Sequence, residues 1–370
     1  SRLAEETILD QQAVNSWENA NRLPLFITAT CDFAPYDNPR IHSLGENILL
    51  RPKTGAIALM TTTRTVFAFS NRVMNENYLR IALEPLPNGE YRRLGDAVKD
   101  AKNYTYQHSA DITNNRKFTL LGDPGLRLAF PSLRVIATSI NGIPTGQTDT
   151  LQAGEKVTIA GEVTDRSGQL LSNFNGYVYS TVYDKPQPVQ TLANDPGSQV
   201  TSFNAQNNIL FKGKATVSGG KFSFSFMVPR DINYRLDNGK LSLYAENGNE
   251  DGSGFYTGFL VGGSAPDTSD DKQGPDIRAF LNDEKFVNGG TTNQTPVLLL
   301  KLSDSSGINT TGRGIGHDII ATLDDDNDQF FVLNDYYQAA LDSYQEGELR
   351  FQLPQLEPGR HTLKVKAWDV

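Results

Sequence analysis

The chain has 370 residues, of which 38% are hydrophobic and 21% charged, and its 43 acidic and 34 basic side chains give a formal net charge of −9. This length and composition are typical of an ordinary soluble protein with two to three domains. The acidic balance argues against nucleic acid as a partner, because no basic surface is available to displace counterions from phosphates.

The sequence also argues against an internal disulfide, a membrane-spanning segment and a signal peptide at its start. A single cysteine cannot form an internal disulfide. No apolar run approaches the roughly 18 residues that span a bilayer. The opening "SRLAEETILD" has neither the basic start nor the apolar core of a signal peptide, and the closing "HTLKVKAWDV" stops within a strand-like pattern. We therefore expect a mature chain or a piece of a longer one.

Helical patterns and apolar runs alternate over the first 131 residues. Helices are predicted over residues 3–19, 43–50, 73–83 and 94–103, and buried strands over 23–30 and 56–63. The helix at 43–50 begins with Ser43 and carries Glu46 three residues later, which is the capping-box pattern. Buried strands that alternate with helices predict a parallel α/β sheet. Residues 122–125, "GDPG", then break any regular element.

After residue 131 the sequence alternates strictly between apolar and polar residues. Examples are "KVTIAGEV" at 156–163, "KFSFSFMVP" at 221–229 and "KLSLYAE" at 240–246. Turn signals separate these runs, so we predict an all-β sandwich of the immunoglobulin-like kind over 132–261. Residues 262–274, "GGSAPDTSDDKQG", read as a linker. A second β-sandwich, truncated at its end, is predicted over 275–370.

The only cysteine, Cys31, stands in "LPLFITATCDFAPYDNP" (residues 23–39), at the end of a predicted strand. Ligands of open parallel sheets bind beyond the carboxyl ends of the strands, so a thiol there is either a small buried hydrophobe or a nucleophile. A nucleophile needs a base, and the sequence offers four histidines: His42, His108, His317 and His361. The first two read as exposed or capping residues and the last two lie in the β regions, so no base is evident.

Four blocks, in order, resemble the gingipain-type cysteine peptidases of family C25: "LPLFITATCDFAPYDNP", "SLGENILL", "TGAIALMTTTRTVF" and "LLGDPGLRLAFP". The resemblance implies that residues 1–131 are the C-terminal half of a caspase-like α/β peptidase domain. It implies that Cys31 is the nucleophile. It also places the family's histidine at the end of the preceding strand, about thirty residues before the cysteine, and therefore upstream of Ser1.

Within that family, the chain resembles the branch of type IX secretion sortases. "TATC" is followed by Asp32 and Phe33, and the block from "GIGHDIIATLD" to the end of the chain (residues 314–370) is similar to that branch. The resemblance implies a peptidase on the bacterial outer-membrane surface that cleaves cargo signal domains through a thioester and passes the cargo to water or to a lipopolysaccharide amine. The implied partners are cargo proteins with a C-terminal secretion signal, outer-membrane attachment proteins and anionic lipopolysaccharide. No cofactor is implied.

Substrate contacts are predicted in "TTTRTVF" (residues 61–67), which follows the strand beside Cys31. We expect Thr62, Thr63 and Phe67 to contact substrate, although these residues can also simply finish a strand. Backbone N–H groups near Cys31 are natural oxyanion donors.

No metal site is predicted from the acidic run "DDDND" at residues 324–328. Its pattern fails the calcium loop, because Gln329 occupies the glycine position and Asp335 the position of the bidentate glutamate. The pair His317 and Asp318 reads as structural.

Two other functions remain open from the sequence. One is a secreted gingipain-like endopeptidase with β-sandwich appendages. The other is a non-catalytic surface protein that binds partners through its sandwiches and retains an inactive peptidase fold.

Overall fold

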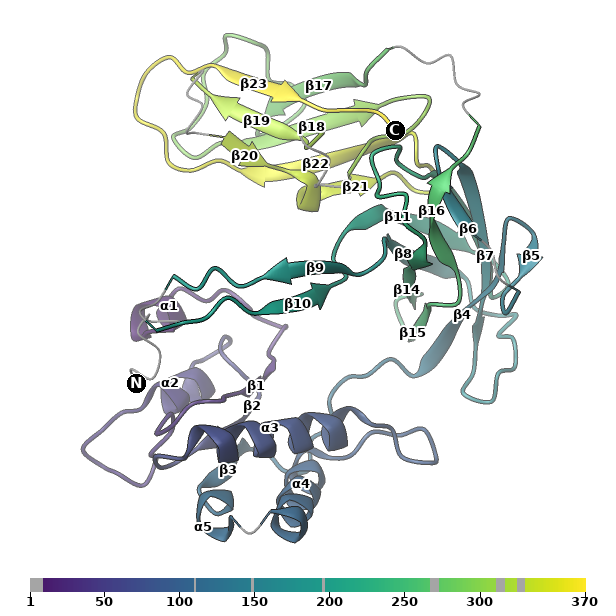
Figure 1. The fold of residues 1–370 in the computed structure, drawn as a ribbon. Coiled ribbons are helices and arrows are strands. Elements are labelled where there is room, and N and C mark those ends of the chain that lie inside the picture. The colour runs from purple at the N-terminus through teal and green to yellow at the C-terminus, as the bar shows by residue number, and fades with distance from the viewer. Residues whose placement is uncertain are drawn as a thin grey trace. The chain divides into compact units, whose positions relative to one another are not determined.

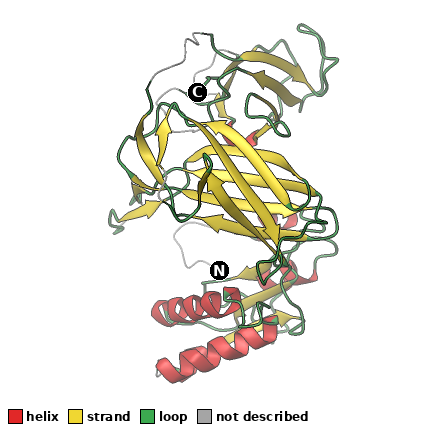
Figure 2. Ribbon diagram, turned by 90° about the vertical axis from the view of Figure 1, so that its right-hand side faces the viewer, coloured by secondary structure: helices red, strands yellow, loops and turns green. Residues whose placement is uncertain are grey.

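The computed structural model describes residues 9–109, 111–147, 150–194, 197–266, 273–310, 317–324 and 330–370. Contacts within the chain divide it into two compact units, Ser1–Phe130 and Pro131–Val370 (Figure 1). The α-helices of the described residues belong to the first unit, and strands dominate the second (Figure 2).

The first unit is built around a small mixed sheet. Its elements are α1 (Gln11–Asn15), β1 (Leu25–Ile27), α2 (Leu44–Leu50), β2 (Ala58–Thr62), α3 (Ala68–Leu83), α4 (Leu94–His108), α5 (Ile112–Asn115) and β3 (Phe118–Gly122). The strand order is β1-β2-β3, with β1 parallel and β3 antiparallel to β2. The prediction of a purely parallel sheet is therefore wrong for its last strand. Residues 118–122 form that strand before the "GDPG" turn, whereas the sequence pattern treated this turn only as an end to regular structure.

Helices cover the sheet of the first unit on both faces. Alternate residues of a strand point to opposite faces. Met60 of β2 packs into the cluster formed with α3 and α4, whereas Leu59 packs with Ile48 of α2. All five residues of β2 are buried, as the apolar run at 56–63 predicted. The result is a central sheet between two helical layers.

Helix ends in the first unit follow local chemistry. Ser43 caps α2: its hydroxyl accepts from the Glu46 N–H at 3.2 Å, and the Glu46 carboxylate accepts from the Ser43 N–H at 2.9 Å. This confirms the predicted capping box. Helices α3 and α4 run beyond their predicted limits, to Ala68 and His108 respectively. Of the helix predicted over 3–19, residues 1–8 lie outside the described residues, and α1 ends at Asn15.

The second unit begins with a large curled sheet. Its strands are β4 (Leu133–Ile140), β5 (Ile143–Pro144), β6 (Thr150–Ala153), β7 (Lys156–Thr164), β8 (Gly176–Tyr183), β9 (Gln187–Gln190), β10 (Ser202–Ala205), β11 (Ile209–Val217), β12 (Lys221–Met227), β13 (Asp237–Asn238), β14 (Lys240–Glu246), β15 (Asp251–Tyr256) and β16 (Leu260–Ser264). Eight strands form one sheet in the order β11-β8-β14-β15-β4-β7-β12, with β5 paired to β4. The short sheets β13-β16-β6 and β10-β9 complete this part.

The large sheet closes on itself through aromatic packing. Phe211 of β11 stacks on Phe224 and Phe226 of β12, with ring centroids 5.7 and 4.9 Å apart, although these strands are at opposite ends of the strand order. Most of this core is thus enclosed by one curled sheet, whereas the alternation in sequence predicted two sheets. The alternation itself is confirmed, because the inward phenylalanines of β12 are buried between outward serines.

The last part of the second unit is a two-sheet sandwich. Its elements are β17 (Asp276–Leu281), β18 (Val297–Ser303), β19 (Ile320–Leu323), β20 (Phe330–Val332), the 3₁₀ helix η1 (Asn334–Tyr336), β21 (Tyr337–Ala339), β22 (Glu346–Gln352) and β23 (Leu363–Lys366). The sheets β17-β18-β22-β21 and β20-β19-β23 share one apolar core. β16 extends to Ser264, so the strand runs into the predicted linker. Of that linker, residues 267–272 lie outside the described residues, as do residues 325–329 of the acidic run.

Candidate active site

The site of the first unit lies where β1 and β2 end. Because these strands are parallel, their carboxyl ends meet at one edge of the sheet. Pairing continues one residue past β1, where the Thr28 N–H donates to Met60 O at 3.1 Å. Cys31 follows on the loop that leaves this edge, four residues after Ile27, the last residue of β1.

The side chain of Cys31 is half-buried and contacts the loop after β2. Its Sγ donates to Val66 O at 3.0 Å and accepts from Val66 N at 3.3 Å. Val66 itself is 5% exposed and belongs to the core beneath the loop. The thiol is therefore held between the two loops at the edge of the sheet, with a backbone N–H aimed at the sulfur.

A second contact ties the same two loops together. Asp32 has a φ of +48°, a left-handed conformation that aspartate tolerates better than most residues. Its carboxylate accepts from Thr65 Oγ1 at 2.5 Å. This bond fastens the turn after Cys31 to the loop that carries Val66.

An ion pair adds a third tie on the solvent side. Arg64 donates to both carboxylate oxygens of Asp37, at 2.8 and 2.5 Å, and each side chain is about half exposed. The Arg64 guanidinium holds the pKa of Asp37 below its ordinary value. A surface ion pair of this kind contributes little to the free energy of folding. Its bidentate geometry, however, sets the distance between the loop after β1 and the loop after β2.

Helix α2 supports the loop from the opposite side. Gly45 N donates to Phe33 O at 3.2 Å. A Cβ on Gly45 would come within 2.6 Å of the Ala34 Cβ, so only glycine allows the helix to approach this closely. The backbone that follows Cys31 is thus packed directly on a capped helix.

The three predicted substrate contacts fall in different environments. Thr62 is fully buried, and its hydroxyl donates to Thr30 O at 2.7 Å. Thr63 is half-buried and donates to Lys117 O at 3.2 Å. Phe67 is 74% exposed and directly precedes α3. Contact with substrate remains a prediction for all three, and at Thr62 it requires a side chain that is now inaccessible.

The backbone at Phe67 is held by a polar network at the start of α5. Asn114 Oδ1 accepts from the Phe67 N–H at 3.4 Å. The Asp111 carboxylate accepts from the Ser70 hydroxyl and from Asn114, and these hydrogen bonds lower its pKa. The ring of Phe67 is therefore exposed, while the hydrogen bond to Asn114 holds the backbone of Phe67 in place.

A shallow cleft of about 780 Å³ opens beside the cysteine loop. We call it the Cys31 cleft, because its wall begins at Asp32, the next residue along the chain. Its other wall includes Thr63 and Arg64, and Asp37 and His42 also line it. The cleft is large enough for a few residues of an extended peptide.

None of the four histidines contacts Cys31 among the described residues, where the thiol's hydrogen-bond partner is Val66. His42 is exposed in the Cys31 cleft. His108 stacks on Tyr104, and its Nδ1 lies 2.8 Å from Tyr104 O. In the second unit, His317 contacts Asp231 and His361 contacts Asp324.

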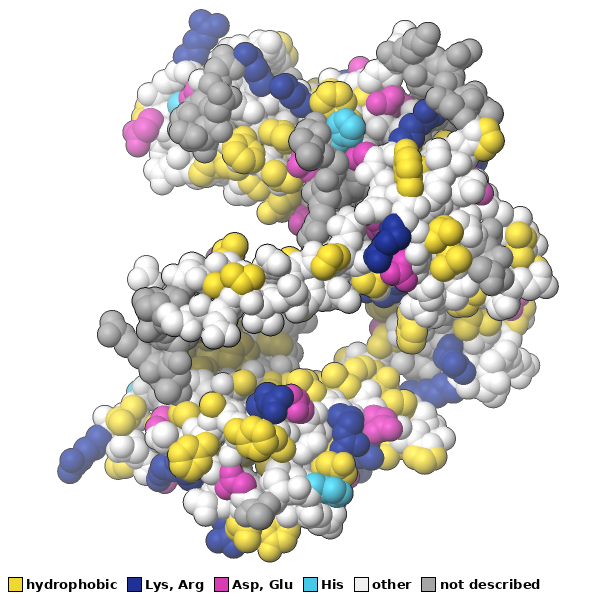
Figure 3. Space-filling view, viewed as in Figure 1, with side chains coloured by type: hydrophobic (Ala, Val, Ile, Leu, Met, Phe, Trp, Pro, Cys, Tyr) yellow, Lys and Arg dark blue, Asp and Glu magenta, His cyan; other side chains and the backbone are white. Residues whose placement is uncertain are grey.

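The described part of the chain contains no group of three His, Cys, Asp or Glu side chains arranged to hold a metal ion. Within the same residues, no helix has the length and apolar character required to cross a bilayer. On the face shown in Figure 3, basic and acidic side chains are interspersed rather than gathered by sign.

Comparison with known proteins finds a family match in the first unit. Residues 1–129 match the family model described as Peptidase family C25. This confirms the resemblance to gingipain-type cysteine peptidases over the region that contains Cys31. No curated protein matches the chain.

Two solved structures are similar to parts of the chain. Dimeric latent PorU from Porphyromonas gingivalis is 30% identical, with a TM-score of 0.43, and the match covers 86% of this chain. The Arg-specific cysteine proteinase gingipain R (RgpB) is 17% identical, with a TM-score of 0.30, over 68% of this chain and 48% of its own. The chain spans 30% of the length of the PorU structure.

The contacts that organise the site could not be read from the sequence. Val66, the Asp32–Thr65 bond and the Asp37–Arg64 pair all join loops that are separated by about thirty residues. Neither strand nor helix periodicity extends into these loops. The one available signal was the position of both loops directly after neighbouring strands.

Proposed function

We propose that this chain carries the nucleophile-bearing part of a cell-surface cysteine peptidase that removes C-terminal signal domains from proteins exported by type IX secretion. The observation that carries the proposal is the placement of Cys31. Its sulfur is held against Val66 at the carboxyl edge of a sheet, the next residue along the chain lines a cleft, and Cys31 lies within the residues that match the C25 peptidase model. The proposal includes a caspase-like peptidase domain and immunoglobulin-like β domains.

The first chemical step is attack by the Cys31 thiolate on the carbonyl carbon of the scissile bond. The proton of the thiol passes to a histidine, which the family resemblance places on the strand before Ser1. As the thiol loses its proton it also loses its bond to Val66 O, while the Val66 N–H continues to stabilise the negative sulfur. The sulfur is thereby released from the carbonyl side and becomes available to substrate.

The tetrahedral intermediate requires donors for its oxyanion. The Asp32 N–H makes only a long bond of 3.4 Å to Arg64 O, so a substrate oxygen can recruit it. Collapse of the intermediate breaks the C–N bond, and the leaving amine takes the proton from the imidazolium. The cargo is then held as a thioester on Cys31.

The acceptor decides the product. Water attacks the thioester to give a free carboxylate, whereas a lipopolysaccharide amine gives an amide, and both restore the thiol. The proposed partners are accordingly cargo proteins with a C-terminal signal, anionic lipopolysaccharide and attachment proteins of the outer membrane. The proposed location is the outer surface of that membrane.

The test uses the whole protein in its own cells, with Cys31→Ala compared with the unchanged protein. We expect secreted cargo to keep its C-terminal signal domain in the variant, which is visible as a higher mass of the secreted proteins. An Asp123→Asn variant, changed in the exposed loop after β3, controls for handling and should process cargo normally. Normal processing by Cys31→Ala would contradict the proposal and leave the protease or binding alternatives.

A further inference from the structure

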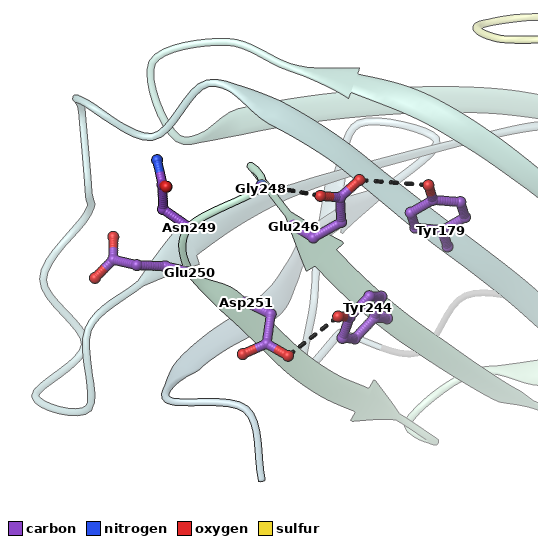
Figure 4. A pocket seen from close by; sticks show the side chains of 7 residues that line it. All are labelled: Tyr179, Tyr244, Glu246, Gly248, Asn249, Glu250 and Asp251. Atoms are coloured by element: carbon purple, nitrogen blue, oxygen red, sulfur yellow. Dashed lines mark hydrogen bonds between the residues drawn. The ribbon is translucent and has the colours of Figure 1, made fainter. Parts of the chain in front are cut away.

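A second pocket lies on the outer face of the curled sheet in the second unit (Figure 4). Its volume is about 680 Å³, and we call it the tyrosine pocket. Tyr179 of β8 and Tyr244 of β14 stand directly opposite each other in the strand register, with ring centroids 6.1 Å apart. Glu246, Glu250 and Asp251, from the β14–β15 hairpin, complete its polar side.

The phenol hydroxyls of the pocket donate hydrogen bonds to its carboxylates. Tyr179 donates to Glu246 at 3.4 Å and Tyr244 donates to Asp251 at 3.1 Å, as the dashed lines in Figure 4 show. Burial raises the pKa of Tyr244, and the bond to Asp251 raises it further. Tyr244 therefore remains a protonated donor, and its ring face is left as a contact surface.

The carboxylates of the pocket are in an unfavourable arrangement on their own. Glu246 and Asp251 are a direct cross-strand pair, and like charges at such positions repel. Glu250 adds a third negative charge from the turn. No lysine or arginine lines the pocket, and none forms an ion pair with these carboxylates among the described residues. A positive charge placed between these carboxylates would relieve their repulsion.

The same sheet face already contains the contact that such a cation would make. The Lys214 ammonium lies 3.8 Å from the ring centroid of Tyr177 and 5.0 Å from that of Tyr179. Further along β8, the Lys240 ammonium lies 4.2 Å from the Tyr183 ring. Tyrosine faces on this surface therefore accept lysine side chains, but within the described residues Tyr244 has no lysine or arginine over it.

We propose that the tyrosine pocket binds the side chain of a lysine presented by a partner protein. The alkyl chain of the lysine lies along the ring of Tyr244, and its ammonium reaches Glu246 and Asp251. Aromatic faces attract ammonium groups, and the flanking carboxylates supply the opposite charge. This binding site is independent of the peptidase activity proposed for the first unit.

The first experiment titrates the full chain, labelled with ¹³C in its tyrosine rings, with n-butylammonium chloride. We expect the signals of Tyr179 and Tyr244 to shift, and the shift to weaken as salt is added. The uncharged probe n-butanol has the same length and should shift them far less. An equal response to butanol, or no response to butylammonium, would overturn the proposal.

Variants then distinguish the contribution of the carboxylates to butylammonium binding from that of the tyrosine ring. Glu246→Gln and Asp251→Asn should each weaken butylammonium binding about threefold. Tyr244→Leu should weaken it about fivefold, whereas Tyr244→Phe keeps the ring and most of the binding. Glu162→Gln is the matched control, because this carboxylate lies on the same sheet but already faces Lys221 at 3.6 Å. Unchanged binding in the double variant Glu246→Gln/Asp251→Asn, with the control spectrum intact, would contradict the assignment.

The source of the ammonium is tested by competition. Nα-acetyl-lysine methylamide should displace butylammonium, and its norleucine analogue, which lacks the charge, should not. Phosphatidylethanolamine vesicles carry the same ammonium on a lipid. Displacement by vesicles but not by the lysine derivative would replace a protein partner with a membrane and overturn the proposal as stated.

Discussion

The Cys31 cleft and the tyrosine pocket are built in opposite ways. The cleft is formed by loops that follow β1 and β2, and cross-loop contacts such as Asp32–Thr65 set its shape. The tyrosine pocket is formed largely by neighbouring strand positions, so the backbone ladder between β8, β14 and β15 places its side chains. In a loop site, a few hydrogen bonds determine where the lining side chains lie. In a strand site, those positions change only if the pairing of the strands changes.

The largest expected effect comes from a change in the core of the curled sheet. Phe226 is 1% exposed and packs against Phe211 where the curled sheet closes. Phe226→Ala should destabilise the second unit by about 3–5 kcal/mol through lost burial and a cavity. Phe255→Ala removes a ring that is 77% exposed, and it should cost less than about 0.5 kcal/mol.

Hydrogen exchange measured by mass spectrometry can follow the two units separately through their own peptides. We expect faster exchange in the second unit of Phe226→Ala and unchanged exchange around β2 and α3. An equal loss of protection in both units would show that they unfold as one body.

The loop site responds to smaller changes. Thr62→Val replaces a buried hydroxyl that donates to Thr30 O, and it leaves that carbonyl without this donor. We expect a loss of about 1–3 kcal/mol from the first unit and a several-fold faster reaction of Cys31 with iodoacetamide, because the loop loosens. Thr63→Val alters a half-buried hydroxyl at a longer bond and should have a smaller effect on both. Similar alkylation rates in the two variants would remove the positioning role from Thr62.

The smallest expected effect concerns the helix that supports the cysteine loop. Ser43→Ala breaks the capping box of α2 and should cost about 0.5–2 kcal/mol at pH 7. Hydrogen bonds from Ser43 lower the pKa of Glu46 below its ordinary value of 4.5. Since the folded pKa is depressed, the stabilisation is present above pH 4.5 and is lost as the pH falls through the folded value.

Denaturant unfolding of the unchanged protein and of Ser43→Ala should therefore differ more at pH 7 than at pH 3. A difference that is independent of pH would mean that the Glu46 carboxylate takes no part in the cap.

The sequence predicted those features that depend on local patterns. The Ser43–Glu46 spacing predicted a cap, and the alternation of phenylalanine and serine in β12 predicted its buried face, because each rule involves neighbouring residues. The antiparallel direction of β3 and the closure of the large sheet were missed. The direction of β3 depends on its pairing with β2, which lies about sixty residues earlier, and the closure depends on the strand order that puts β11 and β12 at opposite ends of one sheet. Periodicity within a strand gives no information about either.

The candidate site was predicted only in part, because local patterns reveal Cys31 but not the distant residues that contact it. Cys31 follows a strand, and this position together with the family resemblance drew attention to it. Its partner Val66 lies 35 residues further along the chain. In the tyrosine pocket, the pattern of β14 exposes Tyr244, but only the register with β8 brings Tyr179 beside it.

We propose that Cys31 forms a thioester with cargo, and that species can be trapped. The whole protein is mixed with a cargo protein that carries its C-terminal signal, quenched in acid and digested, and the peptide that contains Cys31 is weighed. We expect a mass increased by the acyl part of the cargo, which hydroxylamine removes. Cleavage of the cargo with the Cys31 peptide unmodified throughout would contradict it.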